Sequence, residues 1–592
     1  MKGIPLKAII VREAVRRHVK AVTVAVFIFL VVVQGTFHLL ATSEGRPYEA
    51  WDEIMAFNDA QVLVGPAANR TWRYGSTDTF FQWAAIIAYN HLTLTGAYYR
   101  HIRYANAAPQ SWDDPRFLLM EKEKTWPGID YHYFRGVDDR SPIFISRRIH
   151  LAFAYCIIGA IGLGFIGVLG LRSVYIIVPL LLLMVDPVVY VQAYHSLPNA
   201  INALLTFAIV LLAMLFADRF QNRYLMLSAA CFAIALNLKS DIVVVGSAIG
   251  LALVLCFVKK GMKLCLVSGS WAACTFGIIF VATNPFFLAA PGRILSETFA
   301  FMLGQMSMGP PPPQEGYIFA NIRFLSQTLD RSLLWEGARL GLVLAIAVLL
   351  FCLVGAAVKR TPVFMVLAVG AATASVAWSS IVFGVVNPFD RFWLNGFGAF
   401  LATVAMGLLL GEREGMRNAT RATIAVAAIV YCVHVTAEAR QSYLTYVGYR
   451  KSAGFSPFHQ RTRASLYAIK TAKEPGYSQT VLVDQHAYID LLPFRLAGVD
   501  AQYVNMISLQ TVVASLAPGG KYIIVFGKGD YTPFEGAEWP PVLMQAYDAY
   551  QSRLAQYPVL QHYHGRPQRL LYHGPLGNSL DTEMTVAVLS KP

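Results

Sequence analysis

The chain has 592 residues, of which 56% are hydrophobic and only 14% are charged, and its mean hydropathy is +0.47. Soluble proteins carry about 25% charged residues, so this composition excludes an ordinary cytosolic enzyme, a disordered chain and a nucleic-acid-binding protein. The net charge of +14 fits a membrane protein, because cytoplasmic loops of such proteins are enriched in lysine and arginine.

The apolar residues are gathered in blocks of about 20, the length that crosses the hydrocarbon core of a bilayer. The first block, 21–40, follows a basic segment and is predicted to be an uncleaved span whose N-terminus is cytoplasmic. Further spans are expected near 149–171, 173–193, 198–217, 224–239, 242–258, 264–283, 336–358, 362–385, 393–411 and 420–437. The sequence therefore predicts a polytopic α-helical protein of the plasma (inner) membrane with about 11 transmembrane helices.

The loops that this topology places in the cytoplasm are all basic, as the positive-inside rule requires. They hold Arg172; Arg219 and Arg223; Lys259, Lys260 and Lys263; Lys359 and Arg360; and Arg413, Arg417 and Arg421. An odd number of spans then puts the C-terminus outside the cytoplasm. The transmembrane domain is expected over 1–437, with outer loops at 41–145 and 284–335.

The remaining 438–592 segment is predicted to be a small C-terminal α/β domain on the extracytoplasmic (periplasmic) side. Its β-type runs at 480–483, 521–526 and 585–589 alternate with helical stretches such as 542–556.

Acidic residues follow the first span in "YEAWDEIMAFNDAQVL". A partly desolvated carboxylate at the membrane surface can accept a proton from an alcohol, so Asp52 and Glu53 are candidate catalytic bases. Asp59 would share a helix face with Asp52. Asp78 lies on a segment, 73–92, that we expect to be an interfacial helix. The alternative is that Asp52 and Glu53 are solvated interfacial residues or charges at the N-terminus of a helix.

Two basic residues fall at the predicted outer boundary of the membrane, whereas the basic loops named above are predicted to be cytoplasmic. Lys239 is a candidate cation for a phosphate, or else the partner of Asp241 in a local ion pair. Arg391 could grip phosphate oxygens through its planar fork, or could be a snorkelling interfacial arginine.

His195 and Asn199 lie at the outer turn between the third and fourth spans. They are candidate substrate-binding residues, or polar caps. No second His or Cys has metal-binding spacing, so no metal ligand is assigned. Assistance by a divalent cation stays open.

The order of these features resembles that of the GT-C glycosyltransferases, with protein O-mannosyltransferases and aminoarabinose transferases as the most similar branches. The resemblance covers roughly 18–437 and includes "YGSTDTFFQW", "LLMVDPVVYVQAYHSLPNAINALLTFAIVLLA", "NPFFLAAPGRI" and "DRFWLNGFGAFLATVAM". The chain departs from the family pattern at Pro198-Asn199, where the family has Pro-Asp, and at Arg391-Phe392, which lacks the following proline. Because of these departures, the resemblance does not identify the branch of the family or the sugar that is transferred.

The resemblance implies a transferase that takes a sugar from a polyprenyl-phosphate-linked donor at the outer face. The acceptor would be a cell-envelope glycan, lipid or protein. Asp52, or Glu53 as second choice, would deprotonate the acceptor hydroxyl, which attacks the anomeric carbon with inversion. Arg391 and Lys239 would stabilise the departing lipid phosphate. The alternatives are a secondary transporter, a glycan polymerase or ligase, and a non-catalytic scaffold on the same fold.

Overall fold

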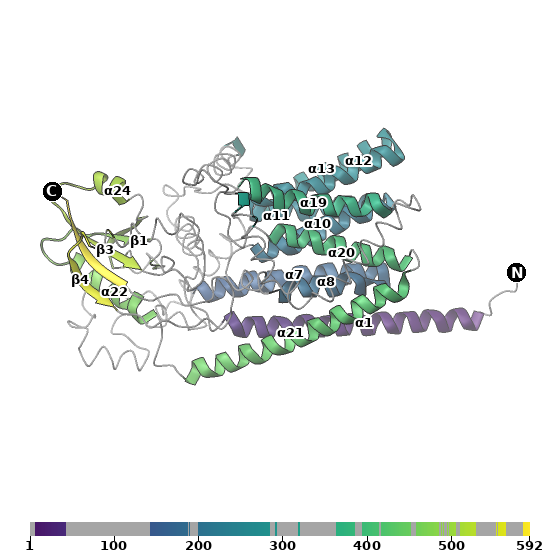
Figure 1. The fold of residues 1–592 in the computed structure, drawn as a ribbon, viewed down its shortest axis with the longest axis horizontal. Coiled ribbons are helices and arrows are strands. Elements are labelled where there is room, and N and C mark those ends of the chain that lie inside the picture. Colours follow the sequence, from purple (N-terminus) through teal and green to yellow (C-terminus); the bar gives the residue numbers. More distant parts are fainter. Residues whose placement is uncertain are drawn as a thin grey trace.

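The computed structural model describes residues 6–42, 142–186, 199–284, 363–384, 394–413, 416–451 and 458–484. Beyond these it describes 497–504, 509–527, 555–563, 584–591 and a few isolated positions. The long helices lie side by side in one bundle, and a small sheet domain lies beyond one end of it (Figure 1).

Ten of the predicted spans are helices in the described residues. They are α1 (Leu6–Thr42), α7 (Pro142–Leu169), α8 (Val174–Val185), α10 (Asn199–Arg219), α11 (Asn222–Leu238), α12 (Ser247–Lys260), α13 (Met262–Thr283), α19 (Val363–Gly384), α20 (Leu394–Arg413) and α21 (Arg417–Lys451). The span expected near 336–358 lies outside the described residues. Among the described residues, seven stretches are long and apolar enough to cross a membrane, with α7 and α8 counted as one. The prediction of a polytopic helical membrane protein is confirmed.

Helix α8, in the third predicted span, ends before the apolar run does. A helix was expected over 173–193, but α8 ends at Val185 and Asp186 is extended, with ψ 125°. The reason is local: a residue that precedes proline is disfavoured in the α region, and Pro187 follows. The sixth span also differs from an ordinary helix, because it begins as the 3₁₀ helix η4 (Ser240–Gly246) before α12.

Helix α10 is the centre of the bundle. Its membrane-length window is entirely buried, and α20 approaches it so closely that a Cβ on Gly398 would lie 2.4 Å from the carbonyl oxygen of Ala203. Only glycine permits this distance between two helix backbones. Close approach through small residues is the usual way in which helices associate where lipid removes the hydrophobic driving force.

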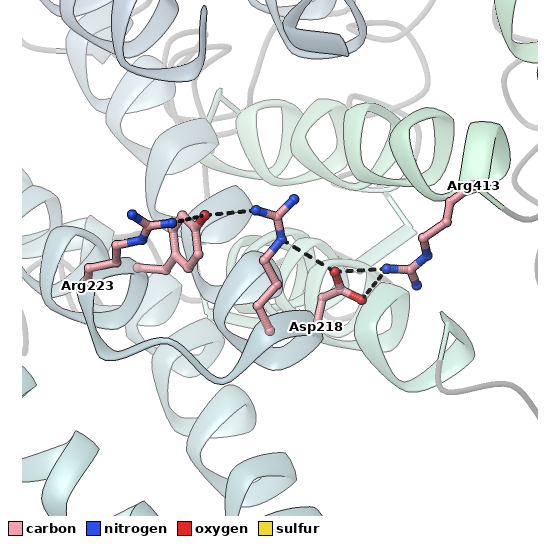
Figure 2. Close-up of polar contacts among 5 residues, drawn as sticks. Asp218, Arg223 and Arg413 are labelled. Atoms are coloured by element: carbon pink, nitrogen blue, oxygen red, sulfur yellow. Dashed lines mark hydrogen bonds and ion pairs between the residues drawn. The ribbon is translucent and has the colours of Figure 1, made fainter. Parts of the chain in front are cut away.

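The predicted cytoplasmic loops that the structure describes meet at one end of the bundle, which we call the basic end; Lys359 and Arg360 lie outside the described residues. The Nη1 atom of Arg413 lies 2.9 and 3.1 Å from the two carboxylate oxygens of Asp218, at the ends of α20 and α10 (Figure 2). At the same end, Arg172 and Arg421 lie 3.3 and 4.0 Å from the carboxylate oxygens of Glu412. These contacts show that three separate basic loops share one end; its cytoplasmic orientation stays a prediction.

The C-terminal domain is built on a five-stranded mixed sheet. Its strands are β1 (Thr480–Asp484), β2 (Asp500–Val504), β3 (Lys521–Gly527), β4 (Val559–Tyr563) and β5 (Met584–Ser590), in the order β2-β1-β3-β5-β4. Strand β1 pairs in parallel with β2 and β3, whereas β5 is antiparallel to β3 and β4. The three predicted β-runs are confirmed as β1, β3 and β5. Strands β2 and β4 were not predicted, and the helix expected over 542–556 lies almost wholly outside the described residues.

Alternate residues of the central strands face two cores. Val481, Ile523 and Val586 pack against α22 (Phe458–Ala472) on one face, while Leu482, Ile524 and Ala587 face α24 (Leu509–Ser515) on the other. Burial on both faces explains why β1, β3 and β5 read as continuous apolar runs.

Helix α21 connects the bundle to this domain and crosses the predicted boundary at 437. It has 35 residues, about 52 Å at 1.5 Å per residue, which exceeds the bilayer core of about 30 Å. In Figure 1 the sheet domain and the N-terminus lie at opposite ends of the bundle. The boundary itself stays a prediction.

Candidate functional site

The position of Lys239 along the bundle follows from the length of α11. The helix starts at the basic end, where the hydroxyl of Tyr224 accepts hydrogen bonds from Arg223 and from Arg219 of α10. Its 17 residues rise about 26 Å, close to the thickness of a bilayer core. Lys239, the residue that follows α11, therefore lies at the end of the bundle opposite the basic loops.

Lys239 and Asn199, two of the predicted site residues, are in direct contact. The backbone of Lys239 is extended, with φ −162° and ψ 137°, and its Nζ donates a hydrogen bond of 3.0 Å to Oδ1 of Asn199. Asn199 is the first residue of α10 and is buried. This hydrogen bond orients the ammonium of Lys239. The side chain of Asp241, the alternative partner, lies outside the described part of the chain.

A column of polar side chains continues from Asn199 into the bundle. Asn202 and Thr206 follow at intervals of three and four residues, so all three lie on one face of α10. Thr206 Oγ1 donates to Oδ1 of Asn395 on α20 at 3.4 Å. Asn395 lies four residues after Arg391 in the sequence.

Asn202 is the exceptional member of this column. It is only 2% exposed, and neither its amide nitrogen nor its amide oxygen has a hydrogen-bond partner among the described residues. A buried amide without partners is costly, so the amide of Asn202 is a candidate to bind a ligand or a water molecule. The sequence analysis did not single out Asn202, although an asparagine one helical turn after Asn199 was a detectable signal.

A second group of amides joins the ends of α11 and α13. Asn237 Nδ2 donates to the carbonyl oxygen of Phe280 at 2.8 Å and to Oγ1 of Thr283 at 2.7 Å, and its Oδ1 accepts from Asn284 Nδ2 at 3.4 Å. The amide of Asn237 is therefore satisfied, unlike that of Asn202. Its bonds hold α13 beside the helix end that carries Lys239.

Asp186 is a further buried carboxylate that the sequence analysis did not assign. It caps the end of α8, is completely buried, and its Oδ1 accepts from the backbone N–H of Val189 at 3.4 Å. An ionisable residue inside a membrane domain is a functional candidate by default. The detectable signal was an acid placed directly after an apolar run and before a proline.

The other predicted residues lie outside the described part of the chain. These are Asp52, Glu53, Asp59, Asp78, His195 and Arg391, and their roles stay predictions. Among the described residues, no group of three or more His, Cys, Asp or Glu side chains could hold a metal ion. The described part of the site is thus a cation on a neutral amide, above a column of buried polar groups.

Comparison with known proteins finds similarity at the level of structure. No known protein family and no curated protein matches the chain. Among solved structures it is similar to ArnT from Cupriavidus metallidurans bound to undecaprenyl phosphate, with 13% sequence identity, a TM-score of 0.41, and coverage of 87% of this chain and 98% of that one. The apo state of that protein gives the same identity and coverage, with a TM-score of 0.38.

Proposed function

We propose that this chain is an integral membrane glycosyltransferase that moves a sugar from a polyprenyl-phosphate donor to an acceptor hydroxyl at the outer face of the membrane. One observation carries the proposal: the ammonium of Lys239 is held by Asn199 at the bundle end opposite the basic loops, 3.0 Å from the amide oxygen. A fixed cation at that depth suits a lipid-linked phosphate, which reaches the site from the membrane itself.

The lipid phosphate gains negative charge when its bond to the anomeric carbon breaks. A preorganised cation stabilises that charge without reorganisation, and the low dielectric at the membrane boundary strengthens the effect. Asn199 supplies the preorganisation, because its hydrogen bond restricts the flexible lysine side chain. Arg391 is the second phosphate-binding residue of the proposal.

The nucleophile is the acceptor hydroxyl, which Asp52 deprotonates, with Glu53 as the second choice. The oxygen attacks the anomeric carbon in line while the phosphate leaves, so the configuration inverts. The proton passes to the carboxylate, and the lipid phosphate departs as an anion. Asp59, Asp78 and His195 are proposed contacts of the sugar or of the acceptor, which is a cell-envelope glycan, lipid or protein.

The first test concerns Lys239. Purified full-length protein in vesicles would be supplied with radiolabelled polyprenyl-phosphate sugars and membrane acceptors. Lys239→Met should lower transfer about 10²- to 10³-fold, the cost of losing one donor to a developing anion, and Lys239→Arg should retain part of it. Lys263→Met, which removes an exposed lysine at the basic end, is the matched control and should transfer normally.

The same assay tests the base and the metal. Asp52→Asn and Glu53→Gln are compared singly, and undiminished transfer by both would remove the base assignment. Added EDTA decides whether a divalent cation assists. The length of the product separates a single-sugar transferase from a glycan polymerase or ligase.

A secondary transporter is the alternative that one structural feature favours. Transporters place binding sites at interrupted helices, and the 3₁₀ segment η4 directly follows Lys239. Flux of a sugar or other solute in liposomes, with no glycosyl transfer by the wild-type protein, would support the transporter and overturn the proposal.

A further inference from the structure

The turn between α10 and α11, at the basic end, has an unusual backbone. Phe220 has φ +52°, in the left-handed region that bulky residues rarely adopt. This conformation places its ring against Phe216, with the centroids 6.0 Å apart and the rings edge to face. The Nζ atom of Lys260, at the end of α12, lies 5.3 Å from the centroid of the Phe220 ring. This contact places the end of α12 beside the turn between α10 and α11.

Two arginines converge on one neutral acceptor at this turn. Arg219 Nη1 and Arg223 Nη2 donate to the hydroxyl oxygen of Tyr224 at 3.0 and 3.1 Å (Figure 2). The two donor nitrogens are thus within about 6 Å of each other, a distance at which like charges repel. Arg223 also lies over the Tyr224 ring, with its Cζ 4.9 Å from the centroid. Like charges held this close favour binding of an anion between them.

The nearby acid does not balance these charges. Both carboxylate oxygens of Asp218 are in contact with Arg413, and its distance to Nε of Arg219 is longer, 3.8 Å. The carboxylate of Asp218 thus contacts two arginines, Arg413 and Arg219, and no contact of it with Arg223 or Lys260 is seen among the described residues. The N-terminus of α11 adds partial positive charge at the same point, and its N-cap, Gln221, makes no side-chain capping bond.

The surface beside these cations is apolar. Phe257, Val258, Met262 and Leu266, around the turn from α12 to α13, are 46%, 64%, 56% and 61% exposed. Exposed apolar side chains at the end of membrane-length helices face lipid acyl chains. Cations next to such a surface meet a phosphate that is attached to acyl chains, rather than a soluble anion.

We propose that Arg219, Arg223 and Lys260 form a binding site for the phosphate group of an anionic phospholipid in the leaflet at the basic end. The two guanidinium groups bind the phosphate oxygens, and Lys260 contributes from the far side of the turn. The acyl chains lie along α12 and α13. This site is separate from the one that contains Lys239, about one bilayer thickness away along α11, and does not depend on the proposed transferase activity.

The test measures lipid retention by the purified full-length protein. Protein would be reconstituted with phosphatidylcholine and phosphatidylglycerol, extracted in mild detergent, and analysed by native mass spectrometry. We expect one tightly retained phosphatidylglycerol, with affinity reduced about fivefold for each charge removed, as expected for about 1 kcal/mol per basic residue. Arg223→Gln and Lys260→Gln are the test variants. Tyr224→Phe removes only the shared hydroxyl and tests the convergence of the arginines.

Two control variants separate a defined site from general electrostatics. Lys259→Gln removes the exposed neighbour of Lys260, and Lys473→Gln removes an exposed charge from the C-terminal domain; both should retain the lipid. Equal losses with Lys259→Gln and Lys260→Gln would overturn the proposal. It would also be overturned if retention did not change in Arg223→Gln, or if inorganic phosphate alone displaced phosphatidylglycerol at equal concentration, since the site would then bind soluble phosphate.

Discussion

Replacing Asn202 by leucine should make the bundle more stable and the protein less active. Asn202 is 2% exposed and its amide has no hydrogen-bond partner among the described residues. An unsatisfied buried polar group costs about 1–3 kcal/mol. Leucine has a similar size and no polar atoms, so Asn202→Leu should raise the free energy of unfolding by about that amount.

The reason for retaining such an amide would be contact with a ligand, one helical turn below the Lys239–Asn199 contact. Loss of a hydrogen bond to the donor would lower transfer by up to about tenfold, since a net hydrogen bond contributes about 1 kcal/mol. A stability gain coupled to a loss of activity is the signature of a binding residue rather than a packing residue.

The assay combines thermal unfolding in detergent with the transfer measurement. Asn237→Leu is the matched control, because the amide of Asn237 is fully bonded to α13; its loss should lower the free energy of unfolding by about 1–3 kcal/mol. The reasoning would be refuted if Asn202→Leu destabilised the protein as much as Asn237→Leu does. That result would mean that Asn202 is bonded in the native protein.

Three further changes test the packing. Gly398→Val should destabilise the bundle by about 1–3 kcal/mol, because its Cβ would overlap the carbonyl oxygen of Ala203. The melting temperature in detergent measures this loss, and an unchanged melting temperature would exclude the close approach of α10 and α20. Arg413→Ala should lower the free energy of unfolding by about 1 kcal/mol or less, because the arginine side chain is 44% exposed although that of its partner Asp218 is only 10% exposed. Chemical denaturation would measure the change, and Arg417→Ala, at an exposed position, is the neutral control. Phe526→Ala should destabilise the C-terminal domain by about 3–5 kcal/mol, because Phe526 is fully buried. Proteolysis of that domain should be faster than in the wild-type protein, and unchanged protease resistance would contradict the described core.

Several features of the structure were readable from local sequence. The spans were predicted because about 20 consecutive apolar residues have one stable place, the bilayer core. The strands β1, β3 and β5 were predicted because burial on both faces requires uninterrupted apolar residues. Strands β2 and β4 escaped prediction because they carry polar residues, such as the sequence "VLQHY" of β4, and are edge strands of the sheet.

The site was only partly predictable. Lys239 and Asn199 were selected separately, 40 residues apart in the sequence, because each lies at a predicted span end. Their hydrogen bond depends on the packing of α10 against α11, which no local pattern specifies. The buried Asp186 escaped assignment because the apolar run suggested a helix that continued past it.

What the sequence determined by itself is the class of protein, and it predicts the side of each loop, because hydrophobic length and loop charge act locally and additively along the chain. What only the tertiary structure decided is which polar groups meet: the ammonium of Lys239 with Asn199, the amide of Asn202 left without a described partner, and two arginines on one tyrosine hydroxyl. Contacts of this kind depend on how helices distant in the sequence are placed against one another, and their energies arise only when that packing removes the groups from water.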